Sequence, residues 1–301
     1  MSAASLLQLV SVVALNACFA TIVGTLSARI WLRESSSSTH HGDVVRSLHR
    51  TETAAIGLAL VAAVLSMWAA SAVMMGGGLG PAAGMLWTMA LQTAYGQAGL
   101  AGIAILATVA VLGRLAPEAM GADAVMSVLL LAFAAARASV SHAGEGGLAS
   151  LAFGVEWLHL VLIALWFGGV AIAGWIVLPQ AHPQGMERVP VNRYLALLSH
   201  AATIALVGIL ATGLYNAWQR VGSVQQLSGN VYGSALVVKL AFVGLAAALG
   251  GYNKLIGFPA ATKSASSSPR AIAILRVESL LLFGALVAAV VLTTNQPPMA
   301  T

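Results

Sequence analysis

The sequence predicts an all-α membrane protein with eight transmembrane helices. Only 8% of its 301 residues are Asp, Glu, Lys or Arg, and 59% are hydrophobic, whereas soluble domains carry about 25% charged residues. The apolar residues occur in stretches of the length that crosses a bilayer, which is roughly 20 residues. This composition excludes a soluble globular enzyme, a disordered protein and a nucleic-acid-binding domain.

The eight apolar stretches follow one another with short connections, so we expect a single transmembrane domain over residues 1–301. Their approximate ranges are 6–32, 51–75, 92–113, 121–141, 150–178, 194–218, 235–256 and 271–294. Polar loops are predicted at 33–50 and 261–270, and the glycine-rich run from Met75 to Pro81 is expected to break any helix. The N-terminal stretch lacks a basic leader and is too long for a signal peptide, so we assign it as the first span.

The few basic residues predict the orientation of the spans. Eleven of the 14 Lys and Arg residues lie in or beside the loops after spans 1, 3, 5 and 7, and only Arg137, Arg220 and Lys239 lie on the other side. By the positive-inside rule, these four loops face the cytoplasm. Both termini are therefore expected in the periplasm.

Two similar junctions suggest an internal repeat. Tyr95-Gly96 opens the third span and Tyr232-Gly233 opens the seventh. Two parallel four-helix halves, residues 1–141 and 142–301, would explain this likeness. Chance is the alternative explanation for so short a match.

Ionisable residues inside the spans are candidate functional groups, because each costs about 2.5–3.5 kcal/mol to insert. Glu156 and His159 lie three residues apart on span 5, so their side chains share one helix face. Such a pair can supply two metal ligands. The alternative is a buried structural pair, in which Glu156 orients the histidine or neutralises Arg137 or Lys239.

His142 lies at the outer end of span 4 and faces the same compartment as His159. His159 is on the order of 12 Å below the top of its helix. The two histidines could share an ion only if span 4 continued past Ser141 or the loop turned inward. Otherwise His142 is an ordinary interfacial histidine.

Methionines gather on the outer side of the first half. Met74, Met75, Met85 and Met89 lie within 16 residues, with Met67 a little deeper. Thioethers are soft ligands suited to Cu(I). Methionine is also an ordinary apolar residue of membrane spans, so both interpretations stay open.

The remaining polar residues indicate structural roles. Arg276 and Glu278 are two residues apart and do not face each other, so each is expected to contact a neighbouring helix. His200 is interpreted as a hydrogen-bonded histidine. Cys18 is the single cysteine, which excludes an internal disulfide and a cysteine-rich metal cluster.

The second half of the chain resembles the CopD family of bacterial copper-resistance membrane proteins over about residues 135–298. The Glu156 to Leu160 segment is similar to the family's Asp-x-x-His-Leu, with Glu in place of Asp. The other similar segments, in chain order, are Ser141-His142-Ala143, Leu165-Trp166-Phe167-Gly168-Gly169, Leu210-Ala211-Thr212-Gly213, Tyr232-Gly233 with Lys239, Asn253 with Pro259, and Glu278 with Pro297-Pro298.

The resemblance implies copper transport across the bacterial inner membrane by a protein that is not an enzyme. It also implies a separate periplasmic partner of the CopC type. Copper would be held by His142, His159 and the outer methionines, with Glu156 as ligand or as orienting group. Arg137, Lys239 and Tyr232 would supply counter-charge or support.

Two other functions remain open. A copper-binding scaffold, delivery protein or sensor would bind the ion without moving it. A b-type haem oxidoreductase would need paired histidines such as His142 and His159.

Overall fold

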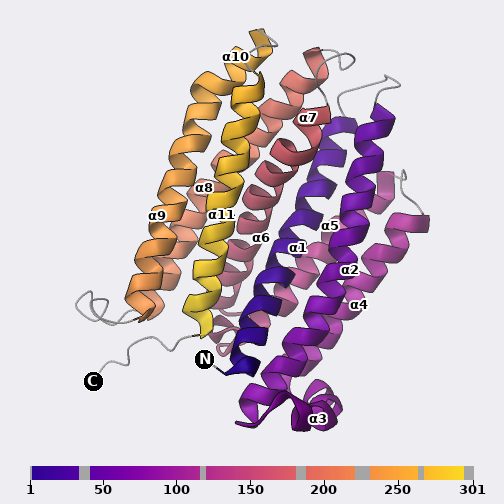
Figure 1. The fold of residues 1–301 in the computed structure, drawn as a ribbon, viewed down its shortest axis with the longest axis vertical. Helices are drawn as coiled ribbons and strands as arrows, with labels where there is room; N and C mark the ends of the chain where they lie inside the picture. The colour runs from indigo at the N-terminus through magenta and orange to yellow at the C-terminus, as the bar shows by residue number, and fades with distance from the viewer. Residues whose placement is uncertain are drawn as a thin grey trace. The chain divides into compact units, whose positions relative to one another are not determined.

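The fold is entirely helical in the part of the chain that the computed structural model describes, which is residues 2–33, 41–115, 120–180, 188–220, 231–263 and 268–294. The long helices are drawn in Figure 1, and no strand occurs among these residues. The first part of the chain contains α1 (Ala3–Arg33), α2 (His41–Met74), α3 (Leu79–Gln92), α4 (Ala94–Leu115), α5 (Met120–Ser139) and the 3₁₀ turn η1 (His142–Gly144). The rest contains α6 (Leu151–Ile172), η2 (Ala173–Val177), α7 (Leu178–Gln180), α8 (Arg188–Arg220), α9 (Val231–Tyr252), η4 (Asn253–Gly257), α10 (Phe258–Lys263) and α11 (Ser268–Thr294).

Eight of the helical segments are long and apolar enough to cross a membrane, which confirms the predicted fold class. They are Ala3–Arg33, Gly42–Met74, Ala94–Leu115, Gly121–Ser139, Leu151–Gln180, Asn192–Gln219, Gly233–Ala261 and Pro269–Thr293. Each coincides with one predicted stretch. The side of the membrane that each terminus faces stays a prediction.

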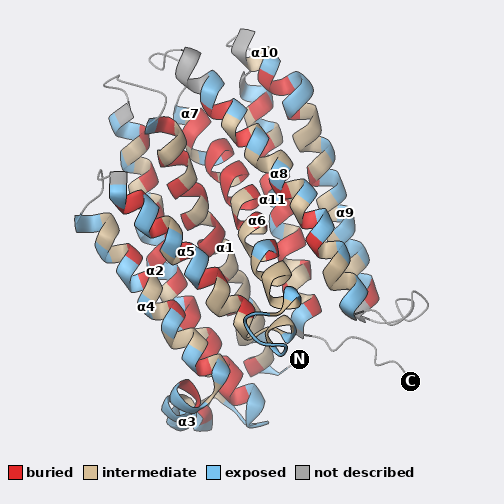
Figure 2. Cartoon of the chain, turned by 180° about the vertical axis from the view of Figure 1, so that it is seen from behind, coloured by how far each residue is buried: buried red, intermediate tan, exposed pale blue. Residues whose placement is uncertain are grey.

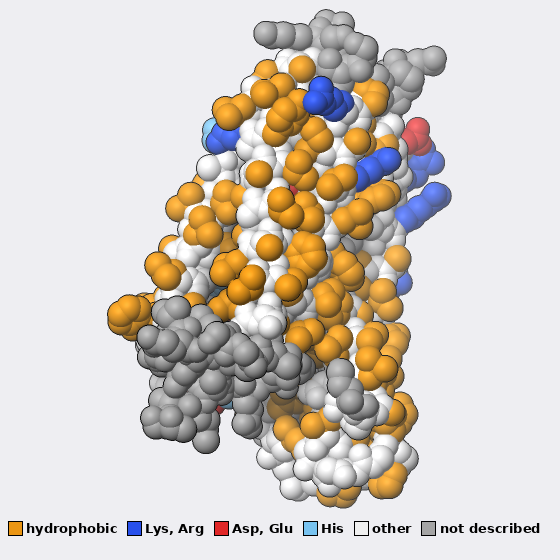
Figure 3. Space-filling model, turned by 60° about the vertical axis from the view of Figure 1, so that its left-hand side comes forward, with side chains coloured by type: hydrophobic (Ala, Val, Ile, Leu, Met, Phe, Trp, Pro, Cys, Tyr) orange, Lys and Arg blue, Asp and Glu red, His pale blue; other side chains and the backbone are white. Residues whose placement is uncertain are grey.

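Large apolar side chains are exposed along these helices, as expected where lipid replaces water. Leu58 and Val61 on α2, Val128 on α5, and Val207 and Leu214 on α8 are more than half exposed. Figure 3 shows hydrophobic side chains over most of the visible face. A soluble protein rarely exposes apolar patches of this extent.

The prediction of a polar loop through residue 50 was wrong for residues 41–50, which form the first turns of α2. Val44 and Leu48 lie four residues apart and are both buried, and Asp43 pairs with Arg46 on the exposed side. The segment is an amphipathic helix, which a search for continuous apolar stretches does not detect. As a result, α2 has 34 residues and is about 51 Å long.

The glycine-rich run ends α2 as predicted, since Gly76 adopts a positive φ of 61°. The 14-residue helix α3 that follows was not predicted. It is too short to cross a membrane of about 30 Å hydrocarbon thickness. Trp68 Nε1 of α2 donates a hydrogen bond to the carbonyl of Leu79, the first residue of α3, at 2.9 Å.

The helices form two compact units, and each is described by itself. Unit 1 comprises Met1–Phe19 and Thr53–Val161. Its helices α4 and α5 pack against each other, and α3 packs on α4. The rings of Phe19 and Phe133 contact each other in its interior, tilted by 35° and with centroids 5.0 Å apart. Figure 2 marks such buried residues in red.

Unit 2 comprises Ala20–Glu52 and Leu162–Thr301. Its helix α11 packs along α9 and also contacts η2, and α9 and α11 lie side by side in Figures 1 and 2. Helices α1 and α6 approach closely at Gly24 and Gly168, where a Cβ on either glycine would overlap the other helix's backbone. Small residues at such crossings let membrane helices pack backbone against backbone.

The segments η2 and η4 are π-helices within spans 5 and 7. Leu178 N–H donates to the Ala173 carbonyl, and Phe258 N–H donates to the Asn253 carbonyl. A proline follows each segment at the second position, Pro179 and Pro259. Proline has no N–H for the carbonyl four residues earlier, which favours the wider helical turn at both places.

Candidate functional site

Glu156 and His159 occupy the first turns of α6, as predicted. The His159 side chain is buried, with 6% of the residue exposed, and Glu156 is half-buried. Both residues interact with other groups of the protein, so neither lacks a partner. Since α6 begins at Leu151, His159 lies about 12 Å along the helix from its start.

His142 lies in a different environment from His159. Helix α5 ends at Ser139, and His142 begins the 3₁₀ turn η1. Its side chain is 73% exposed, and its Nδ1 lies 2.8 Å from Glu145 Oε1. The structure therefore places His142 on the surface with a carboxylate that was not among the predicted site residues.

The four outer methionines divide into exposed and buried residues. Met74, Met75 and Met85 are 63%, 47% and 44% exposed, whereas Met89 on α3 is 6% exposed. Met74 ends α2, Met75 follows it, and Met85 lies one turn before Met89 on α3. Three thioethers are thus accessible around the junction of α2 and α3.

No three or more His, Cys, Asp and Glu side chains gather into a group suited to a metal ion among the residues that the structure describes. Methionine is not one of these four residue types, so this observation does not test the predicted ligand set, which stays a prediction. That set contains two kinds of ligand, the imidazole of His159 and the thioethers of the exposed methionines.

The three predicted supporting residues fall in different places. Arg137 is half-buried in the last turn of α5 and lines a small pocket of unit 1. Lys239 is half-buried on α9 and has a polar contact. Tyr232 belongs to α9, but its side chain lies outside the described residues.

The remaining histidines outside the predicted site, apart from His49, are either exposed or outside the described residues. His200 is exposed, and its Nδ1 lies 2.8 Å from the Ala196 carbonyl of its own helix. This agrees with its interpretation as a hydrogen-bonded histidine, although it is not interior. His40 and His182 lie outside the described residues, as does the side chain of His41.

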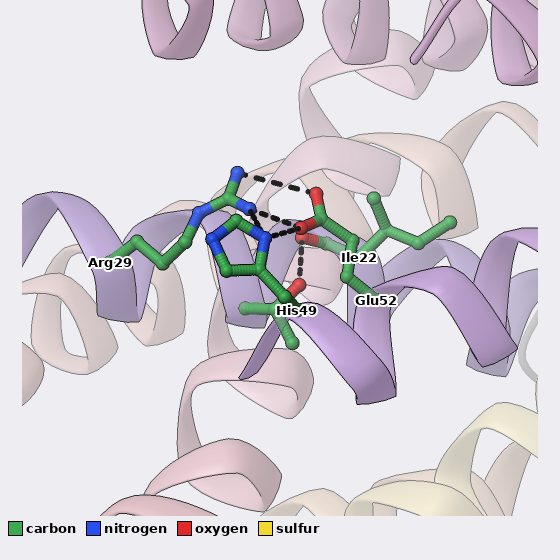
Figure 4. A network of polar contacts seen from close by, with 5 residues as sticks. Ile22, Arg29, His49 and Glu52 are labelled. Atoms are coloured by element: carbon green, nitrogen blue, oxygen red, sulfur yellow. Dashed lines mark hydrogen bonds and ion pairs between the residues drawn. The ribbon is translucent and has the colours of Figure 1, made fainter. Parts of the chain in front are cut away.

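A deeply buried ionic cluster among the described residues was missed in the sequence. Arg29 of α1 forms an ion pair with Glu52 of α2, with side-chain exposures of 3% and 4%. Arg29 Nη2 donates a second hydrogen bond to Glu52 Oε1 at 3.3 Å. His49 Nδ1 lies 3.1 Å from Arg29 Nη1 and 3.8 Å from Glu52 Oε2. Figure 4 shows the three side chains converging from the two helices.

The chemistry of this cluster fixes the histidine's hydrogen-bonding role. A guanidinium has donors and no acceptor, so His49 Nδ1 accepts from Arg29 in the hydrogen-bonded state. The helix covers about 33 Å between Met74 and Glu52. Glu52 therefore lies about one hydrocarbon thickness from the outer end of α2, at the predicted cytoplasmic boundary.

A signal for this pair was present in the sequence. Arg29 lies four residues before the predicted polar segment 33–50, and Glu52 lies two residues after it. In an antiparallel helix pair, residues close to the two ends of one connecting segment lie at similar heights. Opposite charges at matching heights could have predicted the pair.

A second buried carboxylate lies in unit 2. Glu278 on α11 is 1% exposed and accepts a hydrogen bond from Trp166 Nε1 of α6 at 3.0 Å. Arg276 Nε donates to the Gly174 carbonyl at 3.1 Å, and its guanidinium lies 4.8 Å from the Trp175 ring centroid. The expectation that Arg276 and Glu278 each contact a neighbouring helix is confirmed.

Comparison with known proteins gives one match. The family model described as Copper resistance protein D matches residues 191–292, which are 102 of the 301 residues. No curated protein and no solved structure matches. The matched region contains Lys239 and Glu278 but not His142, Glu156 or His159. The match supports membership of the chain in this family.

Proposed function

We propose that this chain, a member of the copper resistance protein D family, moves copper ions across the bacterial inner membrane. The family match carries the proposal, because it covers most of the last three of the eight spans. A function related to copper resistance follows from the family itself. Translocation, its direction and the ligands are the proposed part.

Capture of Cu(I) is proposed at the exposed thioethers of Met74, Met75 and Met85. They are accessible, and soft sulfur suits Cu(I) better than carboxylate oxygen does. By the predicted orientation they face the periplasm, where a separate CopC-type protein would deliver the ion. His142 lies at the same end of unit 1, beside Glu145.

His159 is the proposed ligand inside the membrane. Its imidazole is buried within α6, and imidazole nitrogen is a good copper ligand. Glu156 lies one turn earlier on the same face and would orient the ring, as carboxylates do for metal-bound histidines. A negative-inside potential favours inward movement by about 2.3 kcal/mol per charge for each 100 mV.

Copper flux into proteoliposomes tests the proposal. Purified protein is reconstituted, Cu(I) is supplied outside under a reductant, and a copper-sensitive dye inside reports entry. We expect His159→Ala to lower the initial rate at least tenfold. His200→Ala is the matched control, because His200 is exposed and its hydrogen bond is to the backbone of its own helix. The flux rate of this variant should stay within about twofold of wild type.

Equal flux in the His159 and His200 variants would contradict the assignment of His159. Copper binding by the wild type without flux would instead support the scaffold or sensor alternative. A Soret band in the purified protein would support the haem alternative.

A further inference from the structure

A small pocket in unit 1 contains a charged side chain that the proposed copper path does not require. It opens between α1, α2, α4 and α5 and holds about 20 Å³ of space, enough for about one water molecule. Its polar lining residues are Ser66, Tyr95 and Arg137, and Met67 lines it as well. Apolar residues, among them Phe133 and Val140, line the rest.

The Arg137 guanidinium makes no hydrogen bond or ion pair within the described part of the chain. No Asp or Glu lines the pocket. Arginine stays charged in proteins, and a half-buried charge is costly unless it is paired. The pocket therefore holds a positive charge that no described residue neutralises. The carbonyl end of α5 offsets this charge only in part, by about 0.3–1 kcal/mol.

Tyr95 adds a second donor to the same pocket. It lies in the first turn of α4, and Arg137 lies in the last turn of α5, so both occupy one end of the α4–α5 pair. The Tyr95 hydroxyl has no hydrogen-bond partner among the described residues. Ser66 instead donates to the Ala63 carbonyl at 2.9 Å. The pocket thus offers a cation and a free hydroxyl, and it lacks a strong acceptor for either.

We propose that this pocket binds a phosphate oxygen through Arg137 and Tyr95, supplied by a phospholipid headgroup or by inorganic phosphate. Arginine and phosphate form short, charge-assisted hydrogen bonds. The space admits one oxygen atom and not a whole phosphate, so the rest of the ligand lies outside the pocket. Because α4 and α5 each match a predicted span, the ends that carry Tyr95 and Arg137 are expected at the level of the phospholipid headgroups. The positive charge of Arg137 disfavours a metal ion here, so the inference is independent of copper.

Lipid binding measured by native mass spectrometry tests the proposal. The purified protein is titrated with phosphatidylglycerol and, in parallel, with a galactolipid of the same acyl chains that lacks phosphate. We expect Arg137→Gln to weaken phosphatidylglycerol binding at least tenfold, because hydrogen bonds to charged groups are strong. Arg114→Gln is the matched control, since Arg114 is an exposed arginine in the last turn of α4 that does not line the pocket.

Adding inorganic phosphate shows whether the bound phosphate comes from a lipid headgroup or from free phosphate. If millimolar phosphate displaces the lipid or protects the wild type but not Arg137→Gln against heat, free phosphate is a ligand. If only the phospholipid binds in an Arg137-dependent way, the headgroup is the ligand. Equal phosphatidylglycerol affinity in the Arg137 and Arg114 variants, or equally tight Arg137-dependent binding of the galactolipid, would overturn the proposal.

Two conservative variants keep the test decisive if Arg137→Gln fails to fold. Arg137→Lys retains the charge but loses the paired donors, and Tyr95→Phe loses only the hydroxyl. Both should weaken phosphatidylglycerol binding while the buried Cys18 thiol stays unreactive. Unchanged lipid affinity in both would refute the site.

Discussion

Replacement of Glu52 by Met should destabilise the protein strongly, because it leaves the Arg29 guanidinium buried without its carboxylate. The side chains of Arg29 and Glu52 are 3% and 4% exposed. Removing one partner of such a buried pair costs about 3–5 kcal/mol. At about 2 °C per kcal/mol for a large domain, the unfolding midpoint should fall by about 6–10 °C. Met is similar in volume to Glu, so a cavity adds little.

The double variant Arg29→Met with Glu52→Met should recover most of that loss. Replacing a buried ion pair by apolar residues of similar size is often neutral or stabilising. The two residues contact each other, so their effects should not add. The recovery separates the loss of charge balance from a general disturbance of α1 and α2.

The single cysteine supplies the assay. Cys18 is 6% exposed and is the chain's one thiol. A thiol-reactive fluorogenic dye therefore reports unfolding of the detergent-solubilised protein with one signal per chain. A Glu52→Met midpoint within about 2 °C of wild type, or a double variant less stable than either single variant, would refute the reasoning.

Four further substitutions can be measured with the same dye. Met89→Ala should cost about 2–5 kcal/mol because Met89 is buried, whereas Met85→Ala should stay within about 0.5 kcal/mol. Gly168→Val should destabilise by at least about 1–3 kcal/mol, since a Cβ there would overlap the backbone of α1. Trp166→Phe should cost about 1–3 kcal/mol by removing the hydrogen-bond donor to Glu278.

The matched controls follow from the same contacts. Gly57 on α2 has open space around it, so Gly57→Ala should be neutral or stabilise by up to about 1 kcal/mol. Equal midpoints for the two methionine variants, or for the Gly168 and Gly57 variants, would contradict the packing described. The double variant Trp166→Phe with Glu278→Gln should lose less unfolding free energy than the sum of the losses in the two single variants.

The spans could be predicted because lipid imposes a simple requirement. A helix needs about 20 apolar residues to satisfy its backbone in the bilayer, and all eight predicted stretches coincide with spans. The start of α2 could not be found by that criterion, because residues 41–50 are amphipathic. Helix α3 was likewise missed, since it has 14 residues and follows a glycine-rich break.

The candidate site was predictable only at the level of single residues. That Glu156 and His159 share a helix face follows from their spacing, and this needs no tertiary information. The exposure of His142 and its contact with Glu145 depend on where α5 ends. The Arg29–Glu52 pair joins two helices, and its prediction requires the position of the turn between them.

The two π-helices have a consequence for comparing this chain with its relatives. A π-bulge holds one more residue than the regular α-helical turn that it replaces, so a relative that lacks the bulge at 173–177 or 253–257 is expected to be one residue shorter in that span. An alignment that forbids gaps inside helices would then shift every residue after the bulge by one position. Each homologue of span 5 and span 7 should therefore be aligned separately on either side of 173–177 and 253–257.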